Sequence, residues 1–312
     1  MKLYHSLKSV KRPSSGSIVA IGVFDGLHKG HRRIINTLLK RSKITGRKSL
    51  ILTFYPHPAS VLYSKNPAPL LISLKHRLRL LEELGIDIAV VIEFTEKFSR
   101  MKPERFMRGV LQKRLGMKEM LVGDDFVFGN NAAGNVEFLK SLSEKYGFTL
   151  TKIRLLKSER RIISSTYIRS LIIRGNLARA SRLLGRPVSI LGTVKKGRKK
   201  GRLLGYPTAN IDPHHEAIPP SGVYAVYVYY RKKKYKGILN IGVRPTFYPV
   251  RYPPEPTIEV HIFNFNKDIY GRDIEIIFVK RLRPEKRFKD KEGLINKIKL
   301  DERKARNALK EI

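Results

Sequence analysis

The sequence contains no cysteine, so a disulfide framework is excluded, and this absence fits a reducing compartment. The N-terminal segment Met1–Pro13 is basic and has no apolar core, which predicts that there is no signal peptide. No uninterrupted apolar run approaches the roughly 20 residues that a membrane-spanning helix needs. We therefore expect a cytoplasmic protein that has no membrane partner.

Acidic residues are scarce compared with basic ones. The chain has 64 lysines and arginines against 26 aspartates and glutamates, a formal net charge of +38. Such a charge attracts anionic partners, including nucleotides and nucleic acids. The cations are spread out, with 35 before residue 186 and 29 from there onward, and the longest unbroken basic run is Arg231–Lys234. A spread pattern is typical of a solvated surface, so we expect no dedicated nucleic-acid partner.

The length of 312 residues suits two domains. In residues 1–185, short apolar runs alternate with helical patterns, and a pair of helices closes this half. This alternation predicts an α/β domain with a parallel sheet, whose ligands bind at the carboxyl ends of the strands. The predicted strands are Ser49–Phe54, Ile86–Phe94, Met120–Val122 and Thr149–Leu155, after a first strand at Ile18–Phe24. The predicted helices are His76–Leu84, Glu104–Leu115, Val136–Tyr146, Ser165–Ile173 and Leu177–Leu184.

Residues 186–312 have a different sequence pattern, in which short β-rich runs are separated by turn residues. Several short strands separated by turns predict a small closed barrel. The proline-rich segment Arg244–Pro256 is interpreted as a connecting flap, and Lys289–Lys310 as a charged terminal helix. The predicted strands are Val188–Val194, Val223–Tyr230, Lys236–Ile241, Thr257–Phe263 and Asp273–Arg281.

The segment Gly22–His31 is the most informative part of the chain. It connects an apolar strand to a helix through glycines, so backbone N–H groups and the positive end of the helix dipole meet at one place. His28 and His31 add two ring donors there, which predicts a phosphate-binding site. A structural turn and half of a metal site are the alternatives, because His-x-Gly-His by itself is compatible with both.

Three further segments would lie at the same edge of the sheet. Thr53–Pro58 follows the second strand, and Asp125 in Gly123–Gly129 is placed to contact a ribose or a base, although both segments also fit plain turns. The third segment carries Ser164, Ser165 and Thr166 at a helix start, with Arg169 one turn later. These hydroxyls are good N-caps, but with Arg169 they also form a second phosphate cradle. Two cradles favour a nucleotidyltransferase.

The second half has its own candidate site in Gly201–Asn210. Its glycines and basic residues are suited to cover a polyphosphate, while Thr208 and Asn210 offer neutral oxygens to Mg²⁺. Glu259, on a predicted strand, would face this place and act as a general base, an effect worth about 10²–10⁴-fold. The alternative for Glu259 is a solvent-facing strand residue.

Taken together, these segments resemble the bacterial bifunctional riboflavin kinase/FMN adenylyltransferase family, also called FAD synthetase. The resemblance covers nearly the whole chain, and the order and spacing of the segments carry it. They are Gly22–His31, Thr53–Pro58, Gly123–Gly129, Ser164–Arg169, Gly201–Asn210, Gly222–Ala225, Asn240–Phe247, Val260–Ile262 and Tyr270–Gly271.

The resemblance implies a Rossmann-like nucleotidyltransferase domain in residues 1–185 and a six-stranded riboflavin kinase barrel in residues 186–312. It implies ATP, riboflavin and FMN as substrates, FAD as a product and Mg²⁺ as a cofactor. Glu259, His28 and His31 would be catalytic, and Thr208 and Asn210 would hold the metal. The implied ATP and phosphate contacts are Gly22, Phe24, Asp25, Gly30, Asp125, Ser164, Ser165, Thr166, Arg169, Gly201, Gly205 and Pro207.

Two positions depart from the family pattern. Tyr55 stands where the family usually has aspartate, and Asn264-Phe265 stands where it usually has Asp-Phe. These departures leave open a chain with one active and one degenerate domain. A basic nucleic-acid-binding protein on a nucleotidyltransferase fold is the rival from another class, and it predicts salt-sensitive binding without flavin turnover. The oligomeric state does not follow from the sequence.

Overall fold

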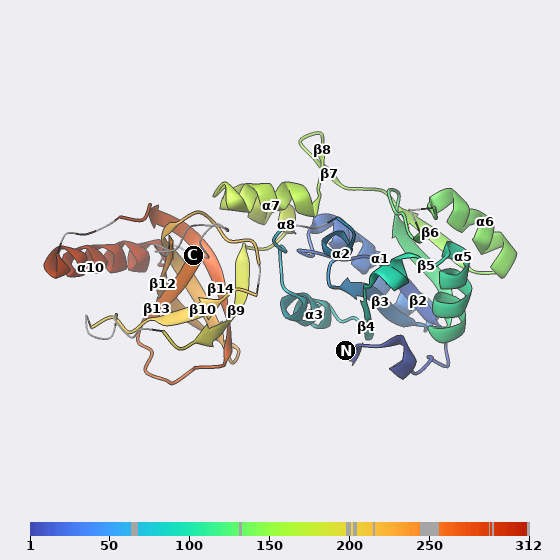
Figure 1. Ribbon diagram of the computed structural model, residues 1–312, viewed down its shortest axis with the longest axis horizontal. Coiled ribbons are helices and arrows are strands. Elements are labelled where there is room, and N and C mark those ends of the chain that lie inside the picture. The colour runs from blue at the N-terminus through green and yellow to red at the C-terminus, as the bar shows by residue number, and fades with distance from the viewer. Residues whose placement is uncertain are drawn as a thin grey trace. The chain divides into compact units, whose positions relative to one another are not determined.

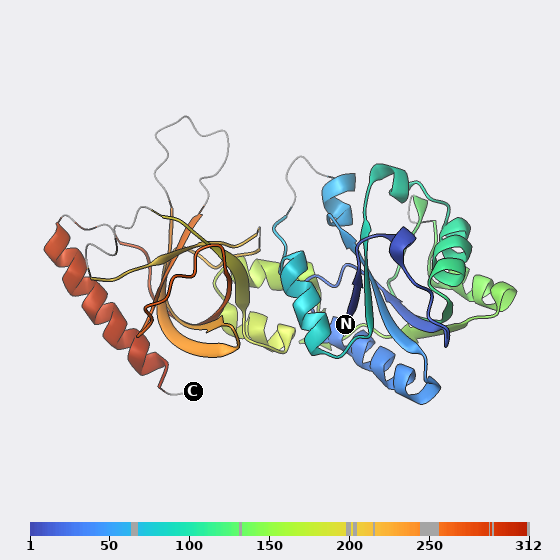
Figure 2. The ribbon, with the colours of Figure 1, turned by 90° about the horizontal axis from the view of Figure 1, so that it is seen from below.

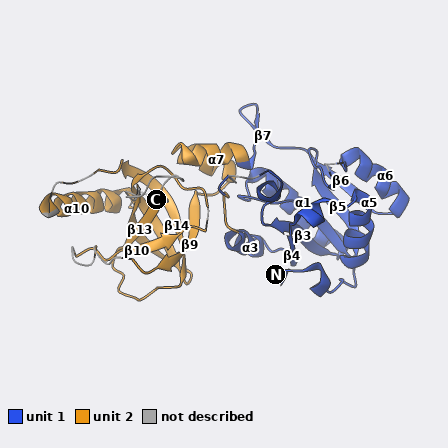
Figure 3. Cartoon of the chain, viewed as in Figure 1, with its two compact units in different colours: residues 1–69, 74–165 blue, residues 70–73, 166–312 orange. Residues whose placement is uncertain are grey.

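The computed structural model describes residues 1–63, 68–130, 133–197, 201, 205–214, 216–243, 256–286, 288 and 290–310. Contacts between residues divide the chain into two compact units, which Figure 3 colours separately. The first unit comprises residues 1–69 and 74–165, and the second comprises residues 70–73 and 166–312. A short segment from the first half of the chain therefore belongs to the second unit.

The first unit is built on a six-stranded sheet (Figure 1). Neighbouring strands are parallel throughout, in the order β1-β4-β3-β2-β5-β6. The chain passes from β2 to β3 on one side and later reaches β5 on the other. Open parallel sheets bind ligands at the carboxyl ends beside such a reversal. The strands are β1 (Lys2–Tyr4), β2 (Ser17–Ile21), β3 (Lys48–Tyr55), β4 (Ile88–Glu93), β5 (Met117–Gly123) and β6 (Thr149–Ile153).

Helices pack against this sheet, as Figure 2 shows from a second direction. α1 packs on β2, β3 and β5. A hydrophobic cluster joins Val19 and Val90 of the sheet to Leu111 of η2 and Leu139 of α6. The remaining elements of this unit are η1 (Leu7–Ser9), α1 (Lys29–Thr45), α2 (Pro58–Leu62), α3 (Leu74–Glu83), α4 (Glu96–Ser99), α5 (Pro103–Arg105), the π-helical η2 (Phe106–Arg114), α6 (Val136–Tyr146), and the paired β7 (Lys157–Ser158) and β8 (Arg161–Ile162).

Capping residues explain where the helices of this unit begin and end. The side chain of Asn135 accepts a hydrogen bond from Phe138 N at the start of α6, and Gly147 follows its end in the left-handed conformation. Gly46 ends α1 in the same way, with φ of 68°. Such glycines stop a helix because they adopt positive φ without steric cost.

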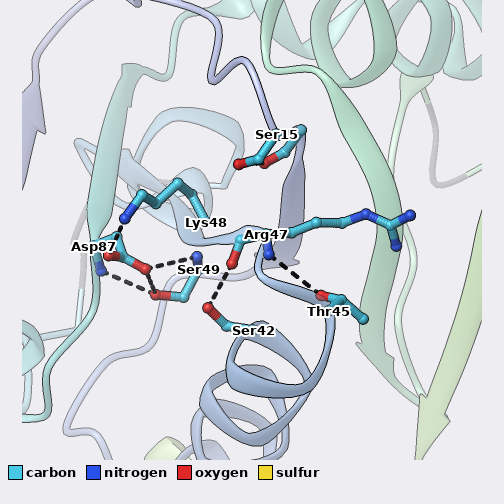
Figure 4. Close-up of polar contacts among 8 residues, drawn as sticks. Ser15, Ser42, Thr45, Arg47, Lys48, Ser49 and Asp87 are labelled. Carbon is cyan, nitrogen blue, oxygen red and sulfur yellow. Dashed lines mark hydrogen bonds and ion pairs between the residues drawn. The ribbon is translucent and has the colours of Figure 1, made fainter.

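Polar groups at the amino ends of β3 and β4 satisfy one another, as Figure 4 shows. Asp87 accepts hydrogen bonds from the backbone N–H of Ser49 at 2.9 Å and from its hydroxyl at 2.7 Å. The Asp87 N–H donates back to the Ser49 hydroxyl at 2.9 Å, and Lys48 Nζ lies 3.2 Å from the carboxylate. Nearby, Ser42 donates to the carbonyl of Arg47 at 2.6 Å. This edge of the sheet is therefore structural, and the opposite, carboxyl edge carries the candidate site.

The second unit contains a closed barrel in the strand order β10-β13-β12-β11-β14-β9. All of its strand pairs are antiparallel. Alternate residues of β13, such as Ile258 and Val260, are buried, while Glu259 between them is only partly buried. The strands are β9 (Ser189–Lys195), β10 (Ala209–Asp212), β11 (Gly222–Tyr230), β12 (Lys233–Val243), β13 (Pro256–Ile262) and β14 (Asp273–Arg283).

Helix α10 (Lys291–Ala308) lies beside the barrel (Figures 1 and 2). It begins at Asp290, whose side chain accepts a hydrogen bond from Gly293 N at 2.7 Å. It packs on β11, β12 and β14, and a cluster joins Val223 and Ala225 of β11 to Ala305. This unit also contains most of α7 (Ser165–Ile173) and all of α8 (Leu177–Leu184).

Residues 70–73 form a strap that is built into the second unit. Leu70 makes a parallel bridge to Glu216, and Ala217 N donates to the carbonyl of Leu70 at 2.6 Å. The buried Glu216 carboxylate accepts from the backbone N–H of Ser73 at 2.8 Å and from that of Leu191 at 3.2 Å. One carboxylate thus links the strap to β9.

The predicted fold class is confirmed: a parallel sheet with helices is followed by a six-stranded closed barrel and a terminal helix. The strands β1, β7, β8 and β10 and the short helices η1, α2 and α4 were not predicted. The prediction of a helix over Glu104–Leu115 was right in position, but its Phe106–Arg114 part is π-helical. The expected flap at Arg244–Pro256 lies outside the described residues apart from Pro256, as do residues 202–204 of Gly201–Asn210.

Candidate active sites

The predicted phosphate loop follows β2 at the carboxyl edge of the sheet. Phe24, Gly26 and Leu27 take positive φ values of 54°, 86° and 45°, which turn the chain sharply into α1. His28 is the N-cap of α1, and its Nδ1 atom accepts a hydrogen bond from His31 N at 3.3 Å. A Cβ atom on Gly30 would come within 3.1 Å of the His28 ring, so this position has little room for a side chain.

The two predicted histidines lie against each other. The His28 and His31 rings are stacked, with centroids 3.7 Å apart, and the buried Phe24 ring meets His31 edge-on at 5.3 Å. Burial lowers the pKa of His28 to about 4, although Asp25 acts in the opposite direction. Burial, followed by the charges of His28 and Arg77, lowers the pKa of His31 well below its ordinary value. Both rings are therefore neutral near pH 7, and they offer hydrogen bonds rather than positive charge.

Other predicted residues reach this loop from two directions. Ser165 at the start of α7 donates its hydroxyl hydrogen bond to the carbonyl of Asp25 at 2.8 Å, so this hydroxyl anchors the loop. Asp25 itself is buried, at 2% exposure, and Ser164 is half-buried. Gly22 continues from β2, and its N–H donates to the carbonyl of Leu52 at 3.1 Å.

The remaining residues predicted for the first site are less enclosed. Asp125 follows β5 and is exposed. Its carboxylate lies close to Gly123, since a Cβ atom added to Gly123 would be 2.9 Å from Asp125 Oδ1. Thr166 is exposed and Arg169 is half-buried, one turn further along α7. Both belong to the second unit by their contacts, whereas Ser164 and Ser165 belong to the first.

The second candidate site is a cavity of about 300 Å³ between the outer wall of the barrel and α10. One part of its lining is apolar, and another part is polar and charged. The apolar part consists of Val223, Ile238, Leu239, Phe288, Leu294 and Ile298. The polar part includes Thr208, Asn240, Glu259, His261, Arg283 and Asp301. A cavity lined by both kinds of side chain can bind a ligand that has an apolar part and a polar part.

Glu259 lies at the centre of three neighbouring strands. It is paired with Asn210 of β10 on one side and with Asn240 of β12 on the other. Side chains that are directly opposite in an antiparallel pair project from the same face, so one carboxylate is flanked by two carboxamides. Glu259 lines the cavity and is partly buried, and its role as a general base stays a prediction.

A hydrogen bond joins the segment before β10 to this face: His261 Nδ1 lies 2.7 Å from the carbonyl of Pro207 and donates to it. Within the segment, Tyr206 N donates to the carbonyl of Gly201 at 2.9 Å. A Cβ atom on Gly201 would lie 3.0 Å from Thr208 Oγ1, so the backbone and this hydroxyl are close neighbours. Gly205 takes a positive φ of 80°.

Comparison with known proteins connects both sites to one family. Residues 10–167 match the family model for FAD synthetase, and residues 184–309 match the one for riboflavin kinase. A bifunctional riboflavin kinase/FMN adenylyltransferase from Buchnera aphidicola subsp. Schizaphis graminum is 37% identical over 96% of both chains. The chain belongs to this bifunctional family. The protein of the same description from Bacillus subtilis (strain 168) is 36% identical over 96% of this chain and 95% of its own length.

A solved structure supports the whole architecture of this family member. It is described as a macrolide-efflux protein from Streptococcus pneumoniae, and it matches with a TM-score of 0.83 and 30% identity over 98% of each chain. Within the described residues of the present chain, no helix is both long and apolar enough to cross a membrane. The likeness to that structure extends over both units of the present chain.

Both departures from the family pattern lie at exposed positions. Tyr55 ends β3 and is 48% exposed. Asn264 follows β13 with a positive φ of 54° and is exposed. Asparagine and aspartate both tolerate this left-handed conformation, so the replacement preserves the turn. Neither residue lines the barrel cavity.

The sequence analysis did not single out Arg77, which lies in α3 and is only 1% exposed. Its Nη1 atom donates to Thr53 Oγ1 at 3.0 Å and to the carbonyl of Phe54 at 3.4 Å. Arg77 occupies the helix position three residues after Leu74 and three before Leu80, within the apolar stripe. A cation at such a position was the available signal, because arginine is rarely buried without a partner.

Proposed function

We propose that this chain phosphorylates riboflavin with ATP to give FMN, and then adenylylates FMN with a second ATP to give FAD and diphosphate. The proposal is supported by the family membership and by the two separate sites. The observation that carries it most is Glu259, which is paired with two asparagines and lines a cavity that has both apolar and polar lining residues. We place the kinase in residues 186–312 and the adenylyltransferase in residues 1–185.

In the proposed kinase reaction, the flavin ring occupies the apolar part of the cavity and the ribityl chain extends towards Glu259. The Glu259 carboxylate accepts the proton of the terminal ribityl hydroxyl while that oxygen attacks the γ-phosphorus of ATP, and ADP leaves. Phosphoryl transfer depends mainly on positioning and charge stabilisation. A general base contributes about 10²–10⁴-fold to such a reaction.

The donor set in this unit fits Mg²⁺. Thr208 and Asn210 offer neutral oxygens, which are hard ligands, and Mg²⁺ commonly uses one or two protein groups together with substrate phosphates. Within the described residues there is no group of three or more histidines and carboxylates that could form a separate metal cage. Thr208 Oγ1 and Asn210 Oδ1 would hold the ion, which when bound neutralises charge on the ATP phosphates.

In the proposed adenylyl transfer, an oxygen of the FMN phosphate attacks the α-phosphorus of ATP, and diphosphate leaves. The attacking phosphate is already anionic, so this step requires no strong base. His28 and His31 donate hydrogen bonds to the charge that develops on the phosphates, together with N–H groups at the start of α1. Neutral rings are suited to this role because they stack without mutual repulsion.

The other assignments are proposals of the same kind. Asp125 would orient the nucleotide, while Ser164, Ser165, Thr166 and Arg169 would contact its phosphates. Gly22, Phe24, Asp25 and Gly30 would also contact the ATP phosphates. Gly201, Gly205 and Pro207 would cover the polyphosphate in the kinase site. We further propose a cytoplasmic enzyme whose partners are its small-molecule substrates.

One experiment with two variants tests the division of labour. Glu259→Gln is expected to reduce FMN formation from riboflavin by at least about 10²-fold and to leave the conversion of FMN to FAD unchanged. His28→Ala combined with His31→Ala is expected to do the opposite. Glu292→Gln removes an exposed carboxylate from the first turn of α10 and serves as the control.

The products are separated by chromatography after incubation with ATP and Mg²⁺, starting once from riboflavin and once from FMN. Loss of both activities in either variant would contradict the assignment of one reaction to each site. If the unmodified chain leaves riboflavin and FMN unchanged, the proposed function is wrong. A chain with one degenerate site would show only one of the two conversions.

A further inference from the structure

Arg77 is a buried cation that the proposed mechanism does not use. A guanidinium at 1% exposure is costly unless hydrogen bonds and charges compensate for its lost hydration. Two acceptors meet its Nη1 atom, namely Thr53 Oγ1 and the carbonyl of Phe54. Its Nε atom is buried and has no hydrogen-bond partner within the part of the chain that the structure describes. Such an incompletely satisfied group calls for an explanation.

The hydrogen bonds of Thr53 have a fixed direction. Arginine can only donate, so the Thr53 hydroxyl accepts from Arg77 and must direct its own proton elsewhere. It donates that proton to the carbonyl of Val23 at 3.1 Å, within the predicted phosphate loop. Thr53 is completely buried, which shields this relay from competing water. Arg77 in α3 is thus connected to the backbone of the loop through a single hydroxyl group.

The charge of Arg77 also acts on this loop. Burial lowers the pKa of Arg77, while the nearby Asp25, followed by Tyr55, acts to raise it, and an arginine stays protonated at neutral pH. The groups that influence His31 are the stacked His28 and Arg77, and Asp25 acts on His28. Because both histidine rings are neutral, Arg77 is the buried positive charge beside the pair.

We propose that Arg77 is a positioning residue for adenylyl transfer, which fixes the phosphate loop through Thr53 and supplies the permanent positive charge behind the His28–His31 pair. This inference rests on the proposed function of the first unit. Arg77 acts through Thr53 and through the electrostatic potential at the loop, and not by taking up a proton. Its contribution is therefore of two kinds, geometric and electrostatic, and different substitutions separate them.

Three variants separate the two contributions. Arg77→Met removes both the donor and the charge, Arg77→Lys keeps the charge with altered donor geometry, and Thr53→Val breaks the relay while keeping the shape and the charge. For each variant, kcat/KM for FAD formation from FMN is measured from pH 9 down to about pH 3.5, because the pKa of His28 is lowered to about 4. FMN formation from riboflavin in the same protein is the internal reference, and circular dichroism monitors folding.

Arg77→Met is expected to lower kcat/KM for FAD formation by about 10- to 100-fold, the size of a lost charge-assisted hydrogen bond. In this variant, the acid limb of the pH profile of kcat/KM should move to higher pH, because without the nearby cation His31 becomes protonated at a higher pH. Arg77→Lys should restore the acid limb, and Thr53→Val should lower the rate without moving the limb. FMN formation should match the wild type in all three.

An acid limb that stays in place in Arg77→Met, or equal losses in both activities, would overturn the inference. So would an Arg77→Lys variant whose acid limb equals that of Arg77→Met. If Arg77→Met does not fold, Thr53→Val decides: a rate at least about fivefold lower supports the relay, and a wild-type rate overturns it. A wild-type chain that forms no FAD would refute the proposed function itself, and the inference with it.

Discussion

The strap of residues 70–73 leads to a quantitative prediction about stability. Glu216 is 2% exposed and accepts hydrogen bonds from the N–H groups of Ser73 and Leu191. Glu216→Ala leaves both donors buried without this acceptor, at about 1–3 kcal/mol each. The expected loss in the free energy of unfolding of the second unit is therefore about 2–6 kcal/mol. A middle value of about 4 kcal/mol lowers the Tm of a unit of this size by about 8–16 °C.

Scanning calorimetry on the full chain measures this loss, and the temperature at which riboflavin phosphorylation stops shows that the affected transition belongs to the barrel. Glu216→Gln keeps one acceptor oxygen and should lose roughly half as much. Glu292→Ala, an exposed carboxylate in the same unit, should change stability by less than about 0.5 kcal/mol. If Glu216→Ala has the same Tm as Glu292→Ala, the strap contributes nothing to barrel stability and the reasoning is refuted.

Two further predictions concern the first unit. Burial raises the pKa of Asp87, but hydrogen bonds from Ser49 and the charge of Lys48 outweigh it and lower the pKa overall. Above about pH 5, the free energy of unfolding of the wild type should therefore be larger than that of Asp87→Asn. This difference should vanish as the pH falls through the lowered pKa of Asp87. A difference in urea unfolding that does not depend on pH would contradict the prediction. Leu38→Ala, at a fully buried position of α1, should lower the free energy of unfolding by about 2–5 kcal/mol in the same assay. Its control is Ile44→Ala, whose side chain is 64% exposed on the same helix and whose loss should lower the free energy of unfolding by less than about 0.5 kcal/mol. Equal effects of the two substitutions would show that burial does not determine the loss.

Local signals explain why most elements were predictable. α6 has the predicted bounds because Asn135 and Gly147 mark its two ends in the sequence. β10 was missed because its four residues, Ala209–Asp212, form a strand only when β9 and β13 pair with them. β1 has three residues and depends in the same way on its pairing with β4. Elements defined by distant partners have little signature of their own.

The candidate sites show the same contrast. His28 and Glu259 became candidates because their neighbours along the chain indicate a strand–helix junction and an alternating strand; their roles stay predictions. Their surroundings were not predictable: the stacking of His28 on His31 and the two asparagines beside Glu259 come from tertiary contacts. Arg77 was missed because its partner Thr53 is 24 residues away. Burial of a single cation becomes visible only when the helix is placed on the sheet.

The location of the candidate kinase cavity on the outer wall of the barrel has a consequence for how this enzyme can evolve. Along β13, Ile258 and Val260 are buried in the barrel wall, while Glu259 and His261 line the cavity. In the proposed kinase site, ligand recognition and barrel stability would therefore depend on alternating positions of one strand. A lineage can change its specificity at every second residue while the interior of the barrel keeps its composition, so adaptation to a new substrate need not erode the scaffold.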